Sequence, residues 1–364
     1  MKILFCGGGT AGHISPAIAL AEEFKIMYPS SKVAFVGRSG GSENSLITAK
    51  KYELFEIDIC GLSRRLSIDN IKAVKKFLKA KRKSEEIIES YQPDAVIGTG
   101  GYVAAPVIYA AQKHNILTAI HESNAVPGLT TRLLSKKCKF IFLGANIKTK
   151  HKNAVYTGNP VSDRFGKLSR SEAKSKLGIP KNEKLIVSVG GSIGAGRIND
   201  TIIEFMQDYI SKTPGIYHIH SSGKRYYDTI QNSYPQLCGN SRKARILPFI
   251  DDMPTYLSAA DLVICRCGAM TLAEISKSAC PSIMIPSPNV TGNHQMKNAL
   301  YFQNNGAGKI IEEKNLCKEV LIETVEYILN DKSITSKMSK AAKSLYVSDS
   351  KSKIISLIQD SLHR

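Results

Sequence analysis

Residues 2–24, KILFCGGGTAGHISPAIALAEEF, join an apolar run, a glycine loop and a periodic amphipathic stretch. The run Lys2–Phe5 predicts a buried strand, and the pattern over Pro16–Phe24 predicts a helix. Glycines allow a backbone to approach a ligand closely, and the first turn of a helix favours an anion. The segment therefore predicts the opening strand, loop and helix of a parallel α/β domain, with a ligand site where the strand ends.

Short apolar runs and longer amphipathic stretches alternate along the rest of the chain. Helical patterns lie between the runs, as at Val103–Lys113. The runs that predict further strands are Lys32–Val36, Ala95–Ile97, Leu117–Ile120, Leu185–Val189, Tyr217–His220, Leu262–Cys265 and Ser282–Ile285. This alternation is typical of parallel sheets that are covered by helices on both faces.

The chain has 364 residues, which is enough for two domains of ordinary size. The strand pattern starts afresh near residue 184, after a polar segment over 166–184. We therefore expect an α/β fold of two Rossmann-like domains, with a boundary near Gly158-Asn159-Pro160. The first domain should cover residues 1–158 and be completed by a C-terminal helix at 346–364. The second should cover 159–345.

Composition narrows the class of protein. Hydrophobic residues make up 43% and charged residues 22%, which indicates a globular chain. No apolar run reaches the length of about 20 residues that a membrane-spanning helix needs, and no signal peptide is evident, so we expect an unexported protein. The eight cysteines are scattered without a Cys-x-x-Cys pair, which fits a reducing compartment and argues against a zinc site. The net charge of +19 indicates an anionic partner: nucleic acid, an acidic membrane surface or a phosphorylated ligand.

Three glycine loops follow predicted strands, at Gly7–Gly12, Gly98–Tyr102 and Gly190–Gly196. The first fits the spacing of a dinucleotide-binding loop, but the second strand is followed by Arg38 instead of the acidic residue that a nicotinamide cofactor requires. That difference argues against a dehydrogenase. The first and third loops open two similar halves, which predicts two domains whose loops face one cleft.

Polar residues lie beside these loops. His13 stands at a predicted helix start, where it can act as a general base, donate to a phosphate or only cap the helix. The segment His121–Asn124 follows a strand, which is typical of a site in this architecture. Glu274 can accept two ribose hydroxyls or be an exposed helix residue, and Asn293–Gln295 can bind sugar hydroxyls or cap a helix.

These loops and clusters, in their order along the chain, resemble the MurG family of bacterial glycosyltransferases. The resemblance rests on Gly8–His13, Gly98–Tyr102, His121–Asn124 with Gly128–Thr130, Gly158–Val161, Gly190–Gly194, Ser222–Lys224, Phe249–Met253, Cys265–Glu274, and His294-Gln295 with Asn298-Ala299. It implies a GT-B fold and an inverting, one-step transfer of N-acetylglucosamine from UDP-N-acetylglucosamine. The implied acceptor is lipid I, undecaprenyl-pyrophosphoryl-N-acetylmuramoyl pentapeptide, and the product is lipid II for peptidoglycan synthesis. No cofactor, metal or nucleic acid is implied, and the place implied is the cytoplasmic side of the cell membrane.

The resemblance also implies roles for individual residues. The positions of Thr10, Ala11, Gly12 and Asn124 line the donor–acceptor cleft, and His13 is the base or an acceptor contact. Ser192 holds the donor diphosphate, Ile250 borders the uracil and Gln295 binds the sugar. The nucleotide and its phosphates are held by Ala269, Met270, Thr271, Leu272, Ala273 and Glu274.

Four departures from the family pattern affect the substrate contacts. Ala11 stands where a glycine is usual, and Ile193 replaces a common glutamine. Ser162 replaces an arginine, with Arg164 two residues further on, so both are candidate substrate contacts. Thr291-Gly292 lacks the usual acidic neighbour.

The segment Leu62–Ile88 contains nine basic residues among apolar ones. Ile71, Val74 and Leu78 share one face of a helix, and such a helix can lie in the interface of an anionic membrane. The alternative is a solvated charged helix packed on its domain. Among other functions, nucleic-acid binding would explain the charge but not the glycine loops. A diacylglycerol glycosyltransferase or a nucleotide-sugar epimerase stays open as a rival enzyme.

Overall fold

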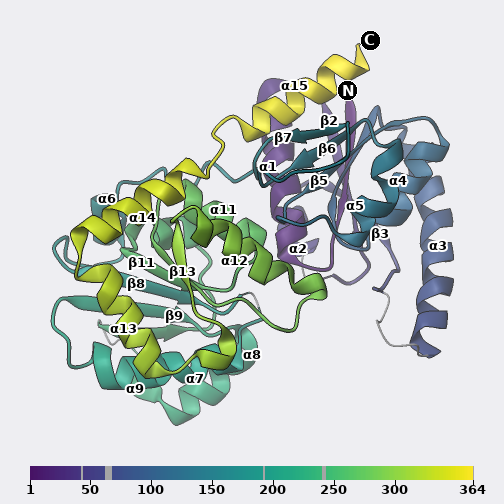
Figure 1. Cartoon of the computed structure of the whole chain (residues 1–364). Coiled ribbons are helices and arrows are strands. Elements are labelled where there is room, and N and C mark those ends of the chain that lie inside the picture. Colours follow the sequence, from purple (N-terminus) through teal and green to yellow (C-terminus); the bar gives the residue numbers. More distant parts are fainter. Residues whose placement is uncertain (42–43, 62–67, 192, 240–242, 364) are drawn as a thin grey trace. The chain divides into compact units, whose positions relative to one another are not determined.

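The computed structural model describes residues 1–41, 44–61, 68–191, 193–239 and 243–363. The chain forms two compact units. Unit 1 contains Met1–Ser162 together with Val347–Arg364, and unit 2 contains Asp163–Tyr346. Each unit is built around one parallel sheet (Figure 1).

Unit 1 holds a sheet of seven strands in the order β3-β2-β1-β4-β5-β6-β7, and every neighbouring pair is parallel. The strands are β1 (Lys2–Gly7), β2 (Lys32–Arg38), β3 (Glu53–Ile57), β4 (Ala95–Gly100), β5 (Leu117–Glu122), β6 (Phe140–Leu143) and β7 (Ala154–Tyr156). The helices are α1 (Ala11–Met27), α2 (Asn44–Thr48), α3 (Ile68–Tyr91), α4 (Ala104–Lys113), α5 (Leu129–Leu134) and α15 (Ser350–Leu362), with a 3-10 turn at Ser135–Lys137.

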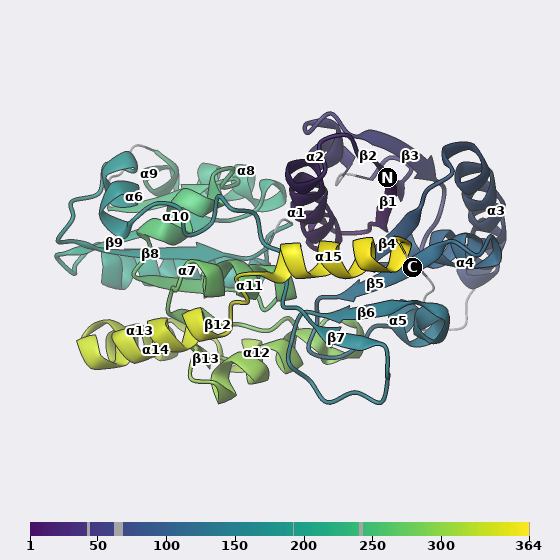
Figure 2. The ribbon, with the colours of Figure 1, turned by 90° about the horizontal axis from the view of Figure 1, so that it is seen from above.

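Side chains alternate across this sheet and divide the core into two layers. On β1, Ile3 and Phe5 pack with α1 and α15, whereas Leu4 and Cys6 pack with α3 and α4. The two groups of helices are seen on opposite sides of the sheet in Figure 2. Since α15 supplies the fully buried Ile354, Ile355 and Ile358, the last helix of the chain is part of the core of unit 1.

Unit 2 holds a sheet of six parallel strands in the order β10-β9-β8-β11-β12-β13. The strands are β8 (Lys184–Val189), β9 (Ile216–Ser221), β10 (Ala244–Leu247), β11 (Leu262–Cys265), β12 (Ser282–Met284) and β13 (Gly308–Ile310). The helices are α6 (Arg170–Lys176), α7 (Gly196–Phe205), α8 (Lys224–Ser233), α9 (Pro235–Cys238), α10 (Met253–Ala259), α11 (Ala269–Lys277), α12 (His294–Asn304), α13 (Lys318–Leu329) and α14 (Lys332–Ser344). Short turns of other helix types lie at Met206–Ile210, Thr291–Asn293 and Glu313–Asn315.

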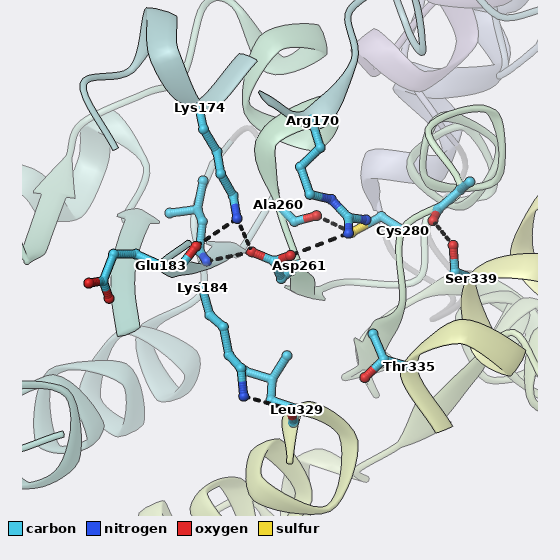
Figure 3. A network of polar contacts seen from close by, with 12 residues as sticks. Arg170, Lys174, Glu183, Lys184, Ala260, Asp261, Cys280, Leu329, Thr335 and Ser339 are labelled. Atoms are coloured by element: carbon cyan, nitrogen blue, oxygen red, sulfur yellow. Dashed lines mark hydrogen bonds and ion pairs between the residues drawn. The ribbon is translucent and has the colours of Figure 1, made fainter. Parts of the chain in front are cut away.

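A polar network fixes the amino ends of β8 and β11 (Figure 3). The carboxylate of Asp261 accepts a hydrogen bond from the backbone N–H of Leu185 at 2.9 Å and lies 2.7 Å from the ammonium of Lys174, which is almost fully buried. Arg170 lies 3.3 Å from the same carboxylate. The network ties α6 to the sheet, so this end of unit 2 has a structural role and the loops at the other end carry the candidate site.

The predicted α/β architecture with two parallel sheets is confirmed, and each predicted strand end lies within three residues of its observed position. The sequence did not predict β3, β6, β7, β10 and β13, which are short or lie at the sheet edges. Within the described part of the chain, we find no helix that combines the length and the apolar character needed to cross a bilayer.

Candidate functional site

The strand order places a candidate site in each unit. In unit 1 the first strand, β1, has β2 on one side and β4 on the other, and in unit 2 β8 lies between β9 and β11. At such a point the connections leave in opposite directions and open a crevice at the carboxyl ends of the strands. The first two glycine loops follow β1 and β4, and the third follows β8, so all three lie at these crevices.

The two glycine loops of unit 1 are in contact with each other. A Cβ on Gly101 would lie 2.0 Å from the carbonyl oxygen of Gly8, and one on Gly100 would lie 2.6 Å from Nδ1 of His13. Both Gly100 and Gly101 have positive φ angles, which side chains rarely adopt. No residue other than glycine fits at either position, because the loops approach too closely and the backbone is left-handed.

His13 lies in the first turn of α1 and its side chain is half-buried. Its backbone carbonyl accepts a hydrogen bond from Oγ1 of Thr99 at 2.6 Å, which ties the helix start to the loop after β4. Thr10 is the N-cap residue but makes no capping bond with its side chain, and Gly12 is exposed. Of Ala11 only the backbone is described.

A buried carboxylate within the predicted site segment His121–Asn124 organises the chain after β5. Glu122 accepts hydrogen bonds from the backbone and side-chain nitrogens of Asn124 at 3.2 and 3.1 Å, and from Gly128 N and Thr131 Oγ1 at 2.7 Å each. These bonds hold Asn124 in place at the crevice of unit 1. The sequence indicated a site in this segment, but it did not indicate that Glu122 is the residue that holds Asn124.

His121 belongs to the core, although its position at the end of a strand suggested a site. Its side chain is buried, its Nε2 lies 3.3 Å from the carbonyl oxygen of Gly158, and burial lowers its pKa to about 4. In this position the neutral histidine connects β5 to the backbone of Gly158.

In unit 2 the loop after β8 leads into α7, which starts at Gly196. Ser192, the residue expected at the diphosphate, lies outside the described residues. Gly194 packs against the loop after β9, since a Cβ on it would lie 2.0 Å from the carbonyl oxygen of Ser222. The amides of this loop and the start of α7 form an arrangement that favours an anion.

The start of α11 follows β11 on the other side of the same crevice. Its N-cap is Gly268, and its first turn contains no acidic residue, so nothing there opposes a bound phosphate. Met270 and Leu272 are buried in the core, whereas Ala269, Thr271 and Ala273 are partly exposed.

Glu274 stands one turn further along α11. The side chain is partly buried, and this burial raises the pKa of its carboxyl from 4.5 to about 8. The carboxyl group is therefore largely protonated at neutral pH unless a ligand favours the charged form. This is a functional signal of the kind that accompanies a binding site, because an exposed helix glutamate would not show it.

Gln295 joins two loops at the carboxyl end of the sheet. Its Oε1 accepts hydrogen bonds from Cys267 N at 3.2 Å and Ser287 N at 2.9 Å. From the same helix, Asn298 donates to the carbonyl oxygen of Cys267 at 3.1 Å. Because Oε1 is used within the protein, the amide nitrogen of Gln295 is the atom suited to donate to a ligand hydroxyl.

The remaining candidates occupy different settings. Ile250 has a buried side chain, so its backbone is the part suited to contact a base. Arg164 forms an ion pair of 2.7 Å with Asp252, which also accepts from Thr255 Oγ1 at 2.6 Å. Ser162 is the last residue of the first segment of unit 1, so it and Arg164 belong to different units.

Comparisons with known proteins cover almost the whole chain. The models of the glycosyltransferase family 28 N-terminal and C-terminal domains match residues 3–143 and 185–354. A protein of Acetivibrio thermocellus named UDP-N-acetylglucosamine--N-acetylmuramyl-(pentapeptide) pyrophosphoryl-undecaprenol N-acetylglucosamine transferase is 40% identical over 99% of this chain and 98% of its own length. A Bacillus cereus protein with the same name, numbered 1, is 39% identical over 97% of each chain.

Solved structures agree with these relatives. The crystal structure of MurG from Acinetobacter baumannii is 27% identical, covers 99% of both chains and has a TM-score of 0.75. A structure of S. aureus MnaA with UDP is 14% identical, covers 100% of this chain and 97% of that chain, and has a TM-score of 0.70, which shows a likeness in fold alone. The chain therefore belongs to glycosyltransferase family 28 and, within it, to the MurG family of N-acetylglucosamine transferases.

Proposed function

We propose that this enzyme transfers N-acetylglucosamine from UDP-N-acetylglucosamine to lipid I and so makes lipid II for peptidoglycan. The observation that carries the proposal is the full-length identity of about 40% with proteins named for this reaction. The rival acceptor diacylglycerol has no such support among these relatives.

The donor is assigned to unit 2. The loop after β8 and the starts of α7 and α11 offer backbone amides to the diphosphate, with Ser192 and residues 269–273 as contacts. Glu274 accepts the ribose hydroxyls, and the backbone of Ile250 contacts the uracil. Gln295 donates through its amide nitrogen to a sugar hydroxyl, and Arg164 is a further candidate contact of the donor.

The acceptor is assigned to unit 1, where Thr10, Ala11, Gly12, Asn124 and Ser162 are its candidate contacts. In an inverting transfer the acceptor hydroxyl attacks the anomeric carbon, and UDP leaves with the electron pair of the broken C–O bond. His13 takes the proton of the attacking hydroxyl. The negative charge that develops on UDP is stabilised by the helix starts and loop amides of unit 2, so this proposed mechanism needs no metal ion.

The enzyme is also proposed to dock on the cytoplasmic side of an anionic membrane through one face of unit 1. We name this the α3–α5 face, since α4 packs against both α3 and α5. Its exposed apolar residues are Val74, Phe77, Leu78, Tyr109, Leu129 and Leu133. Leu78, Leu129 and Leu133 are 59%, 65% and 69% exposed, so these side chains are available to a membrane interface.

Basic residues lie on the same helices as these apolar residues. On α3 they are Lys72, Lys75, Lys76, Lys79, Lys81, Arg82 and Lys83, and α5 contributes Arg132. The buried side of α3 is formed by small or apolar residues such as Ala73, Ala80 and Ile87, so Val74 and Leu78 point away from the core. Exposed apolar groups flanked by cations suit a membrane interface better than water. Residues 62–67 of the predicted segment lie outside the described residues, as do the side chains of residues 68–71.

Measuring UDP release tests the reaction. We expect release with UDP-N-acetylglucosamine and lipid I together, and none above background with diacylglycerol. Release with diacylglycerol but not with lipid I would replace the proposed acceptor. Absence of release with either, from a protein with a cooperative thermal transition, would overturn the transferase assignment for these substrates.

Membrane docking is tested with phosphatidylglycerol vesicles. Replacing Lys75, Lys76, Lys79 and Lys81 with Glu should abolish co-sedimentation at moderate salt, since each change reverses a charge near the surface. Turnover of a soluble, short-chain acceptor should stay close to that of the parent enzyme. Equal co-sedimentation of the variant and the parent would show that α3 is only a solvated charged helix.

A further inference from the structure

A chain of buried polar side chains runs beneath the loops of unit 2. It contains Ser188 on β8, His218 and His220 on β9, and Asn199 on α7, and each of these residues is at most 1% exposed. Oγ of Ser188 lies 2.7 Å from Nε2 of His218 and 2.7 Å from Nδ1 of His220. Nε2 of His220 lies 3.0 Å from Oδ1 of Asn199.

The chain of hydrogen bonds has one direction. Asn199 donates through Nδ2 to the carbonyl oxygen of Ser222 at 3.1 Å, so its Oδ1 must accept from Nε2–H of His220. Neutral His220 then has a lone pair on Nδ1, which accepts the hydroxyl proton of Ser188 at 2.7 Å; the carbonyl oxygen of Ser188, at 3.2 Å, is the poorer contact. Oγ of Ser188 in turn accepts from Nε2–H of His218.

Both histidines are held in the neutral form that this direction requires. Burial lowers the pKa of His220 to about 4, and burial together with the neighbouring His220 lowers the pKa of His218 well below its usual value. Nδ1 of His218 is buried and has no hydrogen-bond partner among the residues that the structure describes. The network therefore leads away from His218 and ends at Ser222.

Ser222, the last residue of this network, packs against the glycine loop that follows β8. Gly194 lies so close to the carbonyl oxygen of Ser222 that a Cβ would meet it at 2.0 Å, and a Cβ on Gly223 would lie 2.5 Å from Gly194 N. Gly194 and Gly223 both have positive φ angles. Because Ser222 and Gly223 lie this close to Gly194, a shift of Ser222 must be transmitted to Gly194 in the loop that follows β8.

We propose that Asn199 and His220 are positioning residues that hold the Ser222–Gly223 segment against the glycine loop of unit 2 and so keep that loop in the shape that binds the diphosphate of the nucleotide donor. This inference rests on the proposed donor site. Neither side chain contacts the donor, and their effect passes through Ser222 and Gly194.

Four variants test the proposal by titration calorimetry with UDP and by steady-state kinetics. Asn199→Leu and His220→Leu each interrupt the hydrogen-bond network between Ser188 and Ser222. The dissociation constant of UDP and the donor KM should therefore rise about three- to tenfold, as for the loss of one buried hydrogen bond. The KM for lipid I should stay unchanged. His220→Gln restores an N–H donor at the position of Nε2 and should return the UDP affinity to within about twofold of the parent.

His218→Leu is the matched control. Like His220→Leu, it removes a fully buried histidine of β9 that is hydrogen-bonded to Ser188. It leaves the hydrogen bonds from His220 through Asn199 to Ser222 in place. It should lower the melting temperature about as much as the other leucine variants and leave the UDP affinity unchanged. If Asn199→Leu does not fold, the comparison of His220→Leu with His220→Gln decides the question alone.

Two results would overturn the inference while leaving the proposed donor site in place. If His218→Leu weakened UDP binding as much as His220→Leu at a similar melting temperature, the network would only stabilise the fold. Equal UDP affinity in His220→Leu and the parent would show that Ser222 does not depend on the network. A parent enzyme that binds no UDP would instead refute the proposed donor site, and this inference with it.

Discussion

Replacing Glu274 with Gln should stabilise the unliganded enzyme at pH 8 while it weakens nucleotide binding. Burial raises the pKa of this carboxyl from 4.5 to about 8, so ionising it in the folded protein is unfavourable. The folded state binds the proton more tightly than the unfolded state. Its contribution to stability is therefore fully present below about pH 4.5, declines as the pH rises and is lost above about pH 8.

Glutamine has nearly the same shape and carries no charge at any pH. The difference in unfolding free energy between Glu274→Gln and the parent should grow from pH 4.5 to pH 8 in favour of the variant. The full pKa shift corresponds to about 5 kcal/mol, which is an upper bound because the side chain is only partly buried. Thermal or urea unfolding at pH 5 and pH 8 measures the difference.

Nucleotide binding should change in the opposite direction. Ribose hydroxyls donate best to the charged carboxylate, so UDP binding to the parent should release a proton at pH 7 and strengthen as the pH approaches 8. Glu274→Gln should lose the proton release and weaken UDP binding by about 1–3 kcal/mol. Titration calorimetry in two buffers of different ionisation enthalpy measures both effects. A variant that is no more stable than the parent at pH 8 would refute the account of burial, and an unchanged UDP affinity would refute the ribose contact.

Three other predictions follow from the site and the fold. His13→Ala should lower turnover about 10²–10⁴-fold and leave UDP affinity nearly unchanged, and a loss below tenfold in the steady-state rate would limit His13 to a structural role. EDTA should leave the transferase rate unchanged, because helix starts and loop amides are proposed to stabilise the leaving UDP; a lost activity that magnesium restores would contradict this. Asp261→Ala should destabilise unit 2 by about 3–5 kcal/mol in a urea titration, since it leaves the buried ammonium of Lys174 without its carboxylate. Glu172→Ala, on the exposed side of α6, should have a much smaller effect in the same titration.

The central strands could be predicted from the sequence because helices cover them on both faces of the sheet. Leu262–Cys265 and the run after Lys2 are uniformly apolar, and only a buried strand or a buried helix gives such a run. The strand Glu53–Ile57 lies at the edge of its sheet, carries two glutamates and is partly exposed, so its pattern resembles that of a loop. Edge strands lose the hydrophobic signal because one side of them is not covered.

The candidate site could be predicted only as far as backbone geometry demands a residue type. Glycine is required where loops approach closely, so the loops at Gly101 and Gly194 can be recognised from the sequence. By contrast, His121 at the end of a strand and His13 at the start of a helix were both candidate site residues, and only the burial of His121 in the folded protein distinguishes them. The hydrogen bond from Asn199 to Ser222 joins residues 23 positions apart, and no local sequence pattern predicts it.

The division of the chain also sets an order for its synthesis and folding. Unit 2 is one continuous segment, whereas unit 1 is interrupted by it and needs residues 347–364 to complete its core. On the ribosome, strand β1 is made first, but the buried isoleucines of α15 that cover it follow only after all of unit 2. Unit 2 can therefore fold while the earlier-made half still exposes an apolar surface, and that half depends on the late helix, or on a chaperone, to avoid aggregation.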